Sequence, residues 1–286
     1  MEKCNSNIEC TEEKRLLFSK NGYPVIECQK CVRRFAVIRD VESHLAKVYS
    51  DDYFFDGKDG YPNYLEEKDI LINYGIHYAK IIERYAKPGK VLDVGCAAGF
   101  ILKGFESLGW EGFGIEPNAT MVSYDIKELN LDIQTGSLES YNTTNKFDLI
   151  TLIQVIGHFY DIDKALENIS HLSSNRGLVL VESWNMNSRV ARLLGKNWHE
   201  YSPPSVINWF SDESLTRLFE KYGFEIVGSG FPAKRINLNH ALSLLEKNTP
   251  NLFFKKSLIA FLSKVSGKLV INYPSVDLKW YLFRKL

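Results

Sequence analysis

Long hydrophobic runs and an excess of charge of either sign are both missing from this sequence. The apolar stretch at residues 258–271 is interrupted by Lys264 and Lys268, and it falls short of the roughly 18–20 apolar residues that span a bilayer. Lysine and arginine together number 35, as do aspartate and glutamate, so no net charge attracts nucleic acid. Residues 1–4 are polar and do not begin a signal peptide. We therefore expect a cytoplasmic protein without a transmembrane segment or a nucleic-acid partner.

Cysteine is scarce as well, and its placement is uneven. Four of the five cysteines lie within the first 31 residues, and a reducing cytosol keeps such thiols out of disulfides. Cys28 and Cys31 form a Cys-x-x-Cys pair, and Cys4 and Cys10 would complete a tetrahedral structural zinc site with them. Five residues separate Cys4 from Cys10, outside the usual spacing of about two to four. Four unliganded thiols are therefore the alternative interpretation.

Short apolar runs alternate with helical patterns through the middle of the chain. This alternation predicts an α/β fold with a doubly wound, mostly parallel sheet whose two faces are covered by helices. Such sheets bind ligands at the carboxyl ends of their strands, so we expect functional residues there. The predicted strands are residues 90–94, 112–115, 131–134, 147–153 and 177–182, and the predicted helices are residues 100–108, 118–129 (N-cap Asn118) and 161–171, with a turn at 173–176.

The segment Val-Leu-Asp-Val-Gly-Cys-Ala-Ala-Gly connects the first of these strands to the first helix. Gly95 and Gly99 allow a sharp turn and the close approach of a ligand to the backbone, at a helix N-terminus that carries partial positive charge. Ala97 and Phe100 replace the second and third glycines of the dinucleotide-binding Gly-x-Gly-x-x-Gly pattern. Asp93 lies inside the end of the strand, where its carboxylate would face a cationic ligand group rather than a phosphate.

A second acidic residue follows the next strand. Glu116 lies 21 residues after Gly95, where a carboxylate accepts hydrogen bonds from ribose hydroxyls in dinucleotide folds. An acid for an amine, a glycine turn for a carboxylate-bearing tail and an acceptor for a diol together describe a site for S-adenosylmethionine. The alternative is that Asp93 caps the following helix and that Glu116 merely ends a strand.

These segments resemble the motifs of class I S-adenosylmethionine-dependent methyltransferases. The resemblance extends to Gly-Ser-Leu-Glu at residues 136–139 and to Phe-Asp-Leu-Ile-Thr-Leu-Ile-Gln-Val-Ile-Gly-His at residues 147–158. It implies S-adenosylmethionine as methyl donor and a Rossmann-like, seven-stranded sheet whose last two strands pair antiparallel. The cofactor-binding residues that it implies are Asp93, Gly95, Cys96 (a small apolar neighbour), Gly99, Glu116 and Pro117, with Gly136, Ser137 and Leu138 along the adenine and Gln154 and Val155 beneath the methionine portion.

The chain departs from the family's pattern at a few positions. Ala97 stands where glycine is common, and Gly157 stands where glutamate is common, so any role of that carboxylate is lost. The N-terminal cysteines and the aromatic residues after them resemble a subgroup with an N-terminal zinc ribbon. In that subgroup both arms are commonly Cys-x-x-Cys, whereas Asn7 stands where the second thiolate is expected.

The composition of each segment and the family resemblance together predict the organisation of the chain. An aromatic insertion at about residues 184–210 is expected either to cover the acceptor pocket as a lid or to pack against the N-terminal ribbon. The lysine-interrupted stretch at residues 251–268 fits a core-facing or lid helix, or a peripheral membrane contact. The predicted segments are a cysteine-rich, zinc-ribbon-like part at residues 1–50, a linker and helix at 51–89, and a methyltransferase domain at 90–286 with C-terminal helices and the last strand at 240–286.

Two histidines are candidate bases for the chemistry. Methyl transfer is a direct displacement at a sulfonium, which mainly needs alignment and a dry pocket. A hydroxyl acceptor also needs a base, and histidine titrates near neutral pH. His158 follows the fourth strand and His199 lies in the insertion, so both are catalytic candidates, with a structural role as the alternative for each.

The sequence therefore predicts an S-adenosylmethionine-dependent methyltransferase for a small-molecule, sugar, polysaccharide or quinone-type acceptor, with O-methylation favoured. The first alternative is an NAD-type nucleotide-dependent oxidoreductase on a related fold. The second is a binding module that has the methyltransferase fold without its activity. Neither the acceptor nor the oligomeric state follows from the sequence.

Overall fold

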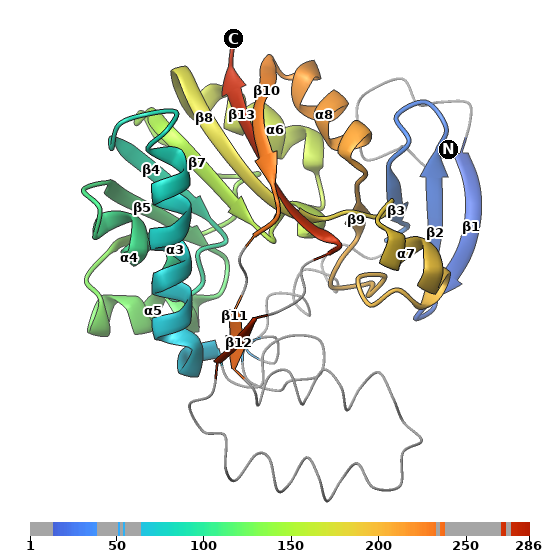
Figure 1. The fold of residues 1–286 in the computed structure, drawn as a ribbon, viewed down its shortest axis with the longest axis horizontal. Helices are drawn as coiled ribbons and strands as arrows, with labels where there is room; N and C mark the ends of the chain where they lie inside the picture. Colours follow the sequence, from blue (N-terminus) through green and yellow to red (C-terminus); the bar gives the residue numbers. More distant parts are fainter. Residues whose placement is uncertain are drawn as a thin grey trace, which may run out of the picture.

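Figure 1 shows the computed structural model, which describes residues 14–38, 51, 54, 64–232, 235–237, 270–272 and 276–286. Cys4, Cys10 and the stretch at residues 251–268 lie outside these ranges, and so do the roles predicted for them. Within the described ranges, no helix is long and apolar enough to cross a membrane.

A seven-stranded sheet forms the centre of the molecule (Figure 1). In spatial order its strands are β10 (Phe224–Gly230), β13 (Leu278–Lys285), β8 (Ser173–Trp184), β7 (Phe147–Ile153), β4 (Lys90–Val94), β5 (Glu111–Glu116) and β6 (Asp132–Thr135). Neighbouring strands pair parallel from β8 through β6, and β13 pairs antiparallel with both β8 and β10. This topology confirms the predicted mostly parallel, seven-stranded sheet with an antiparallel final strand.

The boundaries of the observed strands lie within two residues of the predicted ones except at the start of β8. We expected a turn at residues 173–176 before this strand, but β8 already begins at Ser173. Phe147 pairs with Ser173 while Leu149 pairs with Leu178, so the residues between form an irregular bulge within the strand. Arg176 takes a left-handed backbone conformation there. The residues that were expected to form a turn therefore shift the pairing register between β7 and β8 but do not interrupt the strand.

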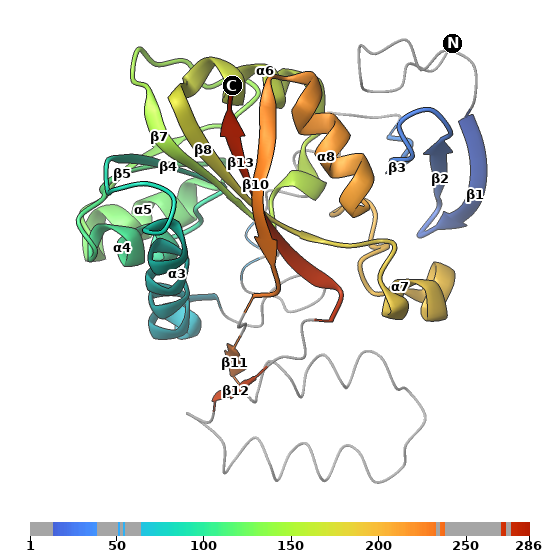
Figure 2. The ribbon, with the colours of Figure 1, turned by 45° about the horizontal axis from the view of Figure 1, so that its top comes forward.

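Helices cover both faces of the sheet (Figures 1 and 2). One hydrophobic core takes side chains from α3 (Lys68–Ile82), α4 (Phe100–Glu106) and α5 (Ala119–Glu128). The core on the other face takes side chains from α6 (Ile162–Leu172) and α8 (Asp212–Lys221). Burial of an apolar stripe on each helix is what their sequence periodicity predicts.

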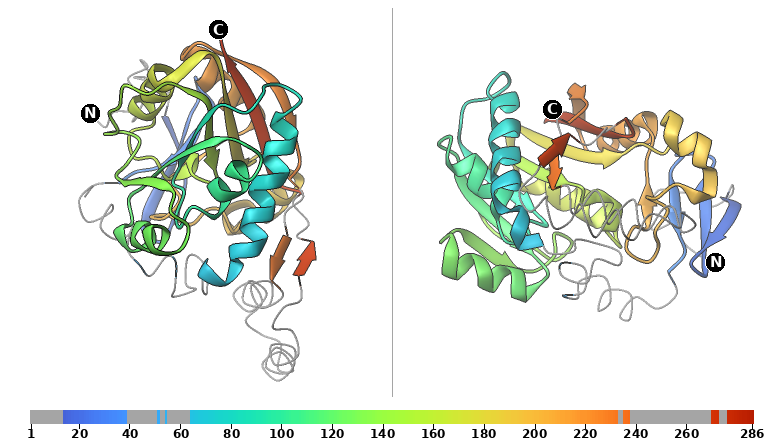
Figure 3. Two further views of the ribbon diagram at one scale, coloured as in Figure 1. Left: turned by 90° about the vertical axis from the view of Figure 1, so that its left-hand side faces the viewer. Right: turned by 60° about the horizontal axis from the view of Figure 1, so that its bottom comes forward.

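A second, antiparallel sheet joins the N-terminal segment to the insertion. It contains β1 (Lys14–Lys20), β2 (Tyr23–Cys28), β3 (Arg34–Ala36) and, from the insertion, β9 (Asn208–Trp209). Val25 of β2 shares a hydrophobic core with Trp198 and Trp209 of the insertion. Figures 2 and 3 show these strands at the opposite end of the molecule from α3, α4 and α5. The insertion thus packs against the N-terminal strands, which is one of the two arrangements expected for it.

The segment before α3 lies against the start of α4. The ring of Tyr64 stacks on that of Phe100 with centroids 5.5 Å apart, and Phe54 meets Tyr64 edge-on at 5.6 Å. These rings share a buried cluster with Ala97 and Ala98 of the turn after β4. The remaining short elements are η1 (Tyr64–Glu67), η2 (Ile156–His158), α7 (Arg189–Leu194), η3 (Gly195–Asn197), β11 (Arg235–Asn237) and β12 (Val270–Asn272).

Candidate functional site

The turn after β4 has the sharp, glycine-dependent geometry that its sequence predicts. Gly95 and Gly99 both have left-handed backbone angles, with φ of 66° and 75°. A Cβ atom on Gly95 would lie only 2.7 Å from Cγ2 of Val155, so a side chain has no room there. Ala97 is also left-handed, with φ of 49°, where glycine would be less strained. We call residues 93–99 together with Glu116 the glycine corner.

Glu116 closes the glycine corner from the end of β5. Its Oε2 accepts a hydrogen bond from the backbone N–H of Ala97 at 2.9 Å, and its Oε1 accepts one from the N–H of Asn118 at 2.8 Å. The residue is buried, and burial raises the pKa of its carboxyl while the two amides oppose that rise. The carboxylate that we predicted for a ribose therefore lies directly against the glycine turn.

Asp93 is the second buried carboxylate of the glycine corner. Thr151 Oγ1, on the neighbouring strand β7, donates to its Oδ1 at 2.5 Å. Burial raises the pKa of Asp93 to about 7, and the charge of Glu116 adds to the rise while the Thr151 hydroxyl opposes it. Gly99, not Asp93, stands at the N-cap of α4. The alternative that Asp93 caps the helix is therefore wrong.

The other residues predicted near the adenosine lie around β5 and β6. The N–H of Gly136 donates to the carbonyl oxygen of Glu116 at 3.0 Å, and a Cβ on Gly136 would meet no atom within 4 Å. Pro117 and Ser137 are half-buried beside it. The side chain of Leu138 is buried in the core below α6. Its place along the adenine stays a prediction.

Cys96 is buried in the core on the α3 side of the sheet. Its Sγ lies 2.7 Å from the position that a Cβ atom on Gly114 would occupy, so the sulfur fills the space of a side chain there. This packing agrees with the interpretation of Cys96 as a small apolar residue. Whether it also adjoins a cofactor stays a prediction.

Gln154 follows β7 in a left-handed conformation with φ of 58°. Two hydrogen bonds join it to Glu182 on β8: its backbone N–H donates to the Glu182 carbonyl at 2.9 Å, and its Nε2 donates to Oε1 at 2.8 Å. Oε2 of Glu182 accepts from the hydroxyls of Tyr74 and Tyr78 on α3. Glu182 was not among the residues predicted from the sequence, although an acid at the predicted end of a buried strand, at the ligand-binding edge of the sheet, was a signal for it.

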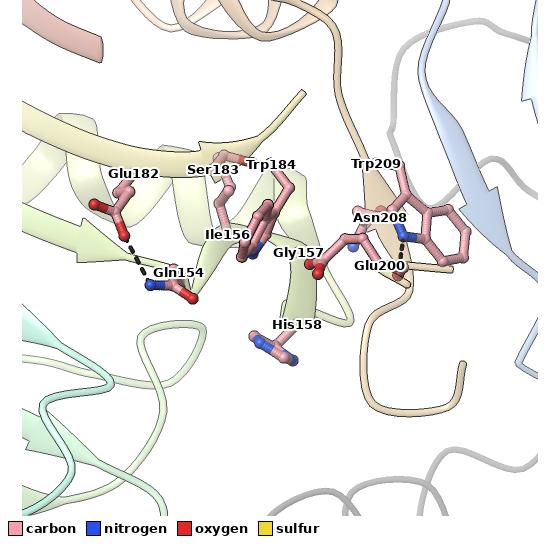
Figure 4. Close-up of a pocket in the computed structure, with 10 residues that line it drawn as sticks. All are labelled: Gln154, Ile156, Gly157, His158, Glu182, Ser183, Trp184, Glu200, Asn208 and Trp209. Carbon is pink, nitrogen blue, oxygen red and sulfur yellow. Dashed lines mark hydrogen bonds between the residues drawn. The ribbon is translucent and has the colours of Figure 1, made fainter. Parts of the chain in front are cut away.

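A pocket opens at the carboxyl ends of β7 and β8, next to the insertion (Figure 4). The indole of Trp184 lies between the Gln154 side and the insertion side of this pocket in Figure 4. Residues of the insertion form one wall, so the insertion both packs on the N-terminal sheet and borders the pocket. The pocket is lined by Gln154, Ile156, Gly157, His158, Glu182, Ser183, Trp184, Glu200, Asn208 and Trp209.

His158 lines the pocket, and His199 does not. Nδ1 of His158 lies 2.7 Å from the carbonyl oxygen of Ser205, which fixes a proton on that nitrogen. Burial lowers the pKa of His158, and the carbonyl oxygens of Ser205 and Gln154 oppose the shift. The imidazole is therefore neutral near pH 7.

His199 packs edge-on against Trp184 with ring centroids 4.7 Å apart. Its Nδ1 lies 4.0 Å from Oδ2 of Asp277. The same oxygen accepts a hydrogen bond from Nε1 of Trp198 at 2.9 Å. The structure thus places His199 behind an indole of the pocket wall. The catalytic roles of His158 and His199 stay predictions.

Gly157 allows the insertion to reach the pocket. A Cβ there would lie 3.1 Å from Cγ1 of Val206 and 3.2 Å from the carbonyl oxygen of Asn208. Its own carbonyl accepts a hydrogen bond from the N–H of Ile207 at 2.9 Å. A glutamate, which the family often has at this position, would displace these contacts.

The predicted zinc ligands fall partly inside the described residues. Cys28 ends β2, and its sulfur accepts a 3.5 Å hydrogen bond from the N–H of Cys31. Arg33 is buried beside them, and its guanidinium nitrogens have no hydrogen-bond partner in the described part of the chain. No group of three or more histidine, cysteine or acidic side chains suited to a metal occurs there either.

Comparison with known proteins identifies relatives of this chain. A family model for the methyltransferase domain matches residues 75–229. The ubiquinone biosynthesis O-methyltransferase of Rhodopseudomonas palustris (strain BisB5) is 30% identical over 103 residues, which cover 34% of this chain and 41% of that protein. The enzyme of the same name from Nitrobacter winogradskyi is 23% identical over 153 residues, or 48% and 57% of the two chains. The chain thus spans about half the length of these relatives.

Solved structures with the same fold cover more of the chain. A S-adenosylmethionine-dependent methyltransferase from Archaeoglobus fulgidus aligns with a TM-score of 0.52 and 16% identity over 78% of this chain and 99% of its own. Magnesium protoporphyrin IX methyltransferase from Synechocystis PCC 6803 aligns with a TM-score of 0.51 and 12% identity over 86% of this chain and 94% of its own. At such identities the likeness shows the fold alone.

Proposed function

The chain belongs to the methyltransferase-domain family, and from this premise we propose that it transfers the methyl group of S-adenosylmethionine to a hydroxyl oxygen of a small molecule. The observation that carries the proposal is the glycine corner. Its carboxylates, Asp93 and Glu116, lie at neighbouring strand ends, and their partners in the described part of the chain are a hydroxyl and two backbone amides. Buried carboxylates held only by neutral donors favour a cationic ligand.

The contacts of the glycine corner support a role for each residue toward the cofactor. Glu116 would accept hydrogen bonds from the ribose hydroxyls, because each of its oxygens has a lone pair besides the one that its amide donor uses. The open space beside Gly136 would take the adenine. Asp93 would favour the positively charged methionine portion, whose path runs past Val155 and Gln154 at the end of β7.

The pocket at β7 and β8 supports an uncharged acceptor. Its ten lining residues include two glutamates and neither lysine nor arginine, so a phosphorylated or carboxylate-bearing acceptor would be repelled. Trp184 offers an apolar surface on which an aromatic or a sugar ring can lie. Relatives named ubiquinone biosynthesis O-methyltransferase favour an aromatic hydroxyl, and sugars are the second candidate class.

We propose His158 as the base for this acceptor. A neutral imidazole with its proton on Nδ1 accepts the hydroxyl proton at Nε2. The acceptor oxygen then attacks the methyl carbon while the carbon–sulfur bond breaks, which leaves S-adenosylhomocysteine and a protonated histidine. Because the displacement needs little other help, alignment and exclusion of water by the insertion would supply the rest of the rate.

Transfer of a labelled methyl group to a panel of acceptors tests the proposed function. The panel contains a catechol, a hydroquinone, a neutral sugar and the phosphate ester of that sugar, each with S-adenosylmethionine as donor. We expect label in a neutral hydroxyl compound and none in the phosphate ester. Binding of S-adenosylhomocysteine without transfer to any acceptor would favour the alternative of a binding module.

We also propose that Cys28 and Cys31 hold a structural zinc ion together with Cys4 and Cys10. The N–H of Cys31 on the sulfur of Cys28 stabilises a thiolate. The buried Arg33 guanidinium would balance a negatively charged metal–thiolate centre. Four protein ligands leave no open position, so the ion would stabilise the fold only. Metal analysis of purified protein tests this, and less than half an equivalent of zinc would leave four unliganded thiols instead.

A further inference from the structure

Glu182 is a buried carboxylate at the junction of the glycine corner and the pocket. It is 0% exposed, and it accepts hydrogen bonds from three neutral donors: the hydroxyls of Tyr74 and Tyr78 and the amide of Gln154. Burial and then the charge of Glu182 raise the pKa of Tyr78 well above 10, so this phenol keeps its proton and donates. Neutral donors thus hold the carboxylate in place on the α3 side.

The contacts of Glu182 determine which end of the Gln154 amide faces away from it. A carboxylate only accepts hydrogen bonds, so the amide must offer its NH₂ group to Glu182 and turn its oxygen the other way. Figure 4 shows this orientation, with the nitrogen toward Glu182 and the oxygen away from it. The second hydrogen bond, from the Gln154 N–H to the Glu182 carbonyl, holds the backbone as well.

The backbone of Gln154 is strained, which indicates that its placement matters. A left-handed conformation at a residue other than glycine costs about 1–2 kcal/mol, and Gln154 has φ of 58°. Such strain persists where surrounding contacts over-determine a residue, commonly at functional sites. Here the two hydrogen bonds to Glu182 offset the strain.

From this geometry, and resting on the proposed function, we infer that Glu182 is a positioning residue that makes Gln154 present an amide oxygen to the ammonium group of the S-adenosylmethionine methionine portion. β7 lies between β4 and β8, and a buried carboxylate lies near the carboxyl end of each of these neighbours, Asp93 one residue before the end of β4 and Glu182 two residues before the end of β8. The ammonium donates hydrogen bonds, whereas the sulfonium has none to give. An amide oxygen between two acids is therefore suited to the ammonium.

Calorimetric titration of Glu182→Gln with two nucleosides tests the inference. S-adenosylhomocysteine has the ammonium group, and 5′-methylthioadenosine has none. A glutamine at position 182 would offer its oxygen to Tyr74 and Tyr78 and its NH₂ to Gln154, which reverses the Gln154 amide. We expect the affinity for S-adenosylhomocysteine to fall at least tenfold and that for methylthioadenosine to stay within twofold of wild type.

The exchanged double variant, Glu182→Gln with Gln154→Glu, provides a rescue. A glutamate at position 154 accepts from the new NH₂ group and still offers an oxygen to the ligand, so S-adenosylhomocysteine should bind within threefold of wild type. Gln154→Glu alone places two carboxylates together and should bind weakly. Glu213→Gln, the same change at an exposed ion pair with Arg217 on α8, is the matched control and should bind like wild type.

Several outcomes would overturn the inference. Unchanged binding of S-adenosylhomocysteine by Glu182→Gln would do so, and so would an equal loss for both nucleosides or a double variant that does not recover. If Glu182→Gln fails to fold, Tyr74→Phe removes one donor and leaves the Gln154 tether, so it should lower the melting temperature without changing the ratio of the two affinities. A wild-type protein that binds neither nucleoside would instead reject the proposed function on which the inference rests.

Discussion

The glycine corner and the pocket next to it are assembled over very different distances along the chain. In the corner, Glu116 contacts Ala97 only 19 residues away, through loops that directly follow adjacent strands. In the pocket, His158 meets Ser205 over 47 residues and Glu182 meets Tyr74 over 108. Apart from the contact of Asp93 with Thr151, 58 residues away, local turns form the corner, whereas the pocket needs the insertion, α3 and the N-terminal sheet to come together.

This difference distinguishes the corner, whose features are general, from the pocket, whose features are particular to this chain. The corner consists mostly of backbone groups and two acids, which suit one fixed cofactor. The pocket combines an imidazole, indoles and carboxylates from several segments, which suits a specific acceptor. Apart from Gln154 and Glu182, where the pocket meets the corner, we therefore expect changes around the pocket to alter turnover or stability while cofactor affinity is kept, and changes in the corner to do the opposite.

The largest effect is expected from Trp198→Ala on the pocket side. Trp198 is fully buried in the core that the insertion shares with β2, and it donates a hydrogen bond to Asp277. Its loss should lower the free energy of unfolding by about 3–5 kcal/mol, measured by urea denaturation. The folded variant should still bind S-adenosylhomocysteine like wild type, and loss of that affinity would show that the two regions are not separable. Leu193→Ala, exposed on α7, is the control.

Next in size is Glu116→Ala in the glycine corner. The change removes the acceptor for the Ala97 and Asn118 amides and for the ribose hydroxyls, and hydrogen bonds to a charged group contribute about 1.5–3 kcal/mol each. We expect S-adenosylhomocysteine to bind about 100-fold more weakly by calorimetry, a loss of ~2.7 kcal/mol. Glu111→Ala, at the exposed start of the same strand, should change nothing. A Glu116 variant with wild-type affinity would remove the corner from the cofactor site.

His158→Gln tests the chemistry of the pocket without touching the corner. If His158 is the base, kcat should fall at least tenfold, because positioned general bases contribute about 10²–10⁴-fold. The Kd for S-adenosylhomocysteine should stay within twofold of wild type. A variant with unchanged kcat would leave His158 a structural link between η2 and the insertion.

The smallest effect is a pH dependence from Asp93. Its pKa is about 7 in the free protein, and a bound cation would lower it, so binding releases a proton and affinity rises with pH through that value. Between pH 6 and pH 8 we expect S-adenosylhomocysteine to bind more tightly by up to about tenfold. Asp93→Asn should remove the pH dependence, and an equally steep profile in that variant would assign it to another group.

The sequence predicted the parts of the molecule that depend on local physics. Strands β4 and β7 begin and end at the predicted residues, because continuous apolar runs bounded by glycine or polar residues mark buried strands. Asn118 caps α5 as expected, accepting from the N–H of Met121 at 2.9 Å. The contact of Glu116 with the glycine turn could be predicted because the carboxyl ends of neighbouring parallel strands lie at the same edge of a sheet.

What the sequence did not predict depends on contacts between distant segments. The pairing of β3 with β9 has no local signal, since β9 is two residues long. The cluster of Glu182 with Tyr74 and Tyr78 needs the position of α3 over the sheet. The bulge that begins β8 was expected as a turn, because its residues favour turns while their strand neighbours hold them in the sheet.

Calorimetric titration of the wild-type chain with S-adenosylhomocysteine and, separately, with NAD tests the central claim most directly. The glycine corner should bind one S-adenosylhomocysteine per chain and give no heat with NAD, because Ala97 and Phe100 leave no glycine cradle for a pyrophosphate. Heat with NAD and none with S-adenosylhomocysteine would contradict the whole account of the site.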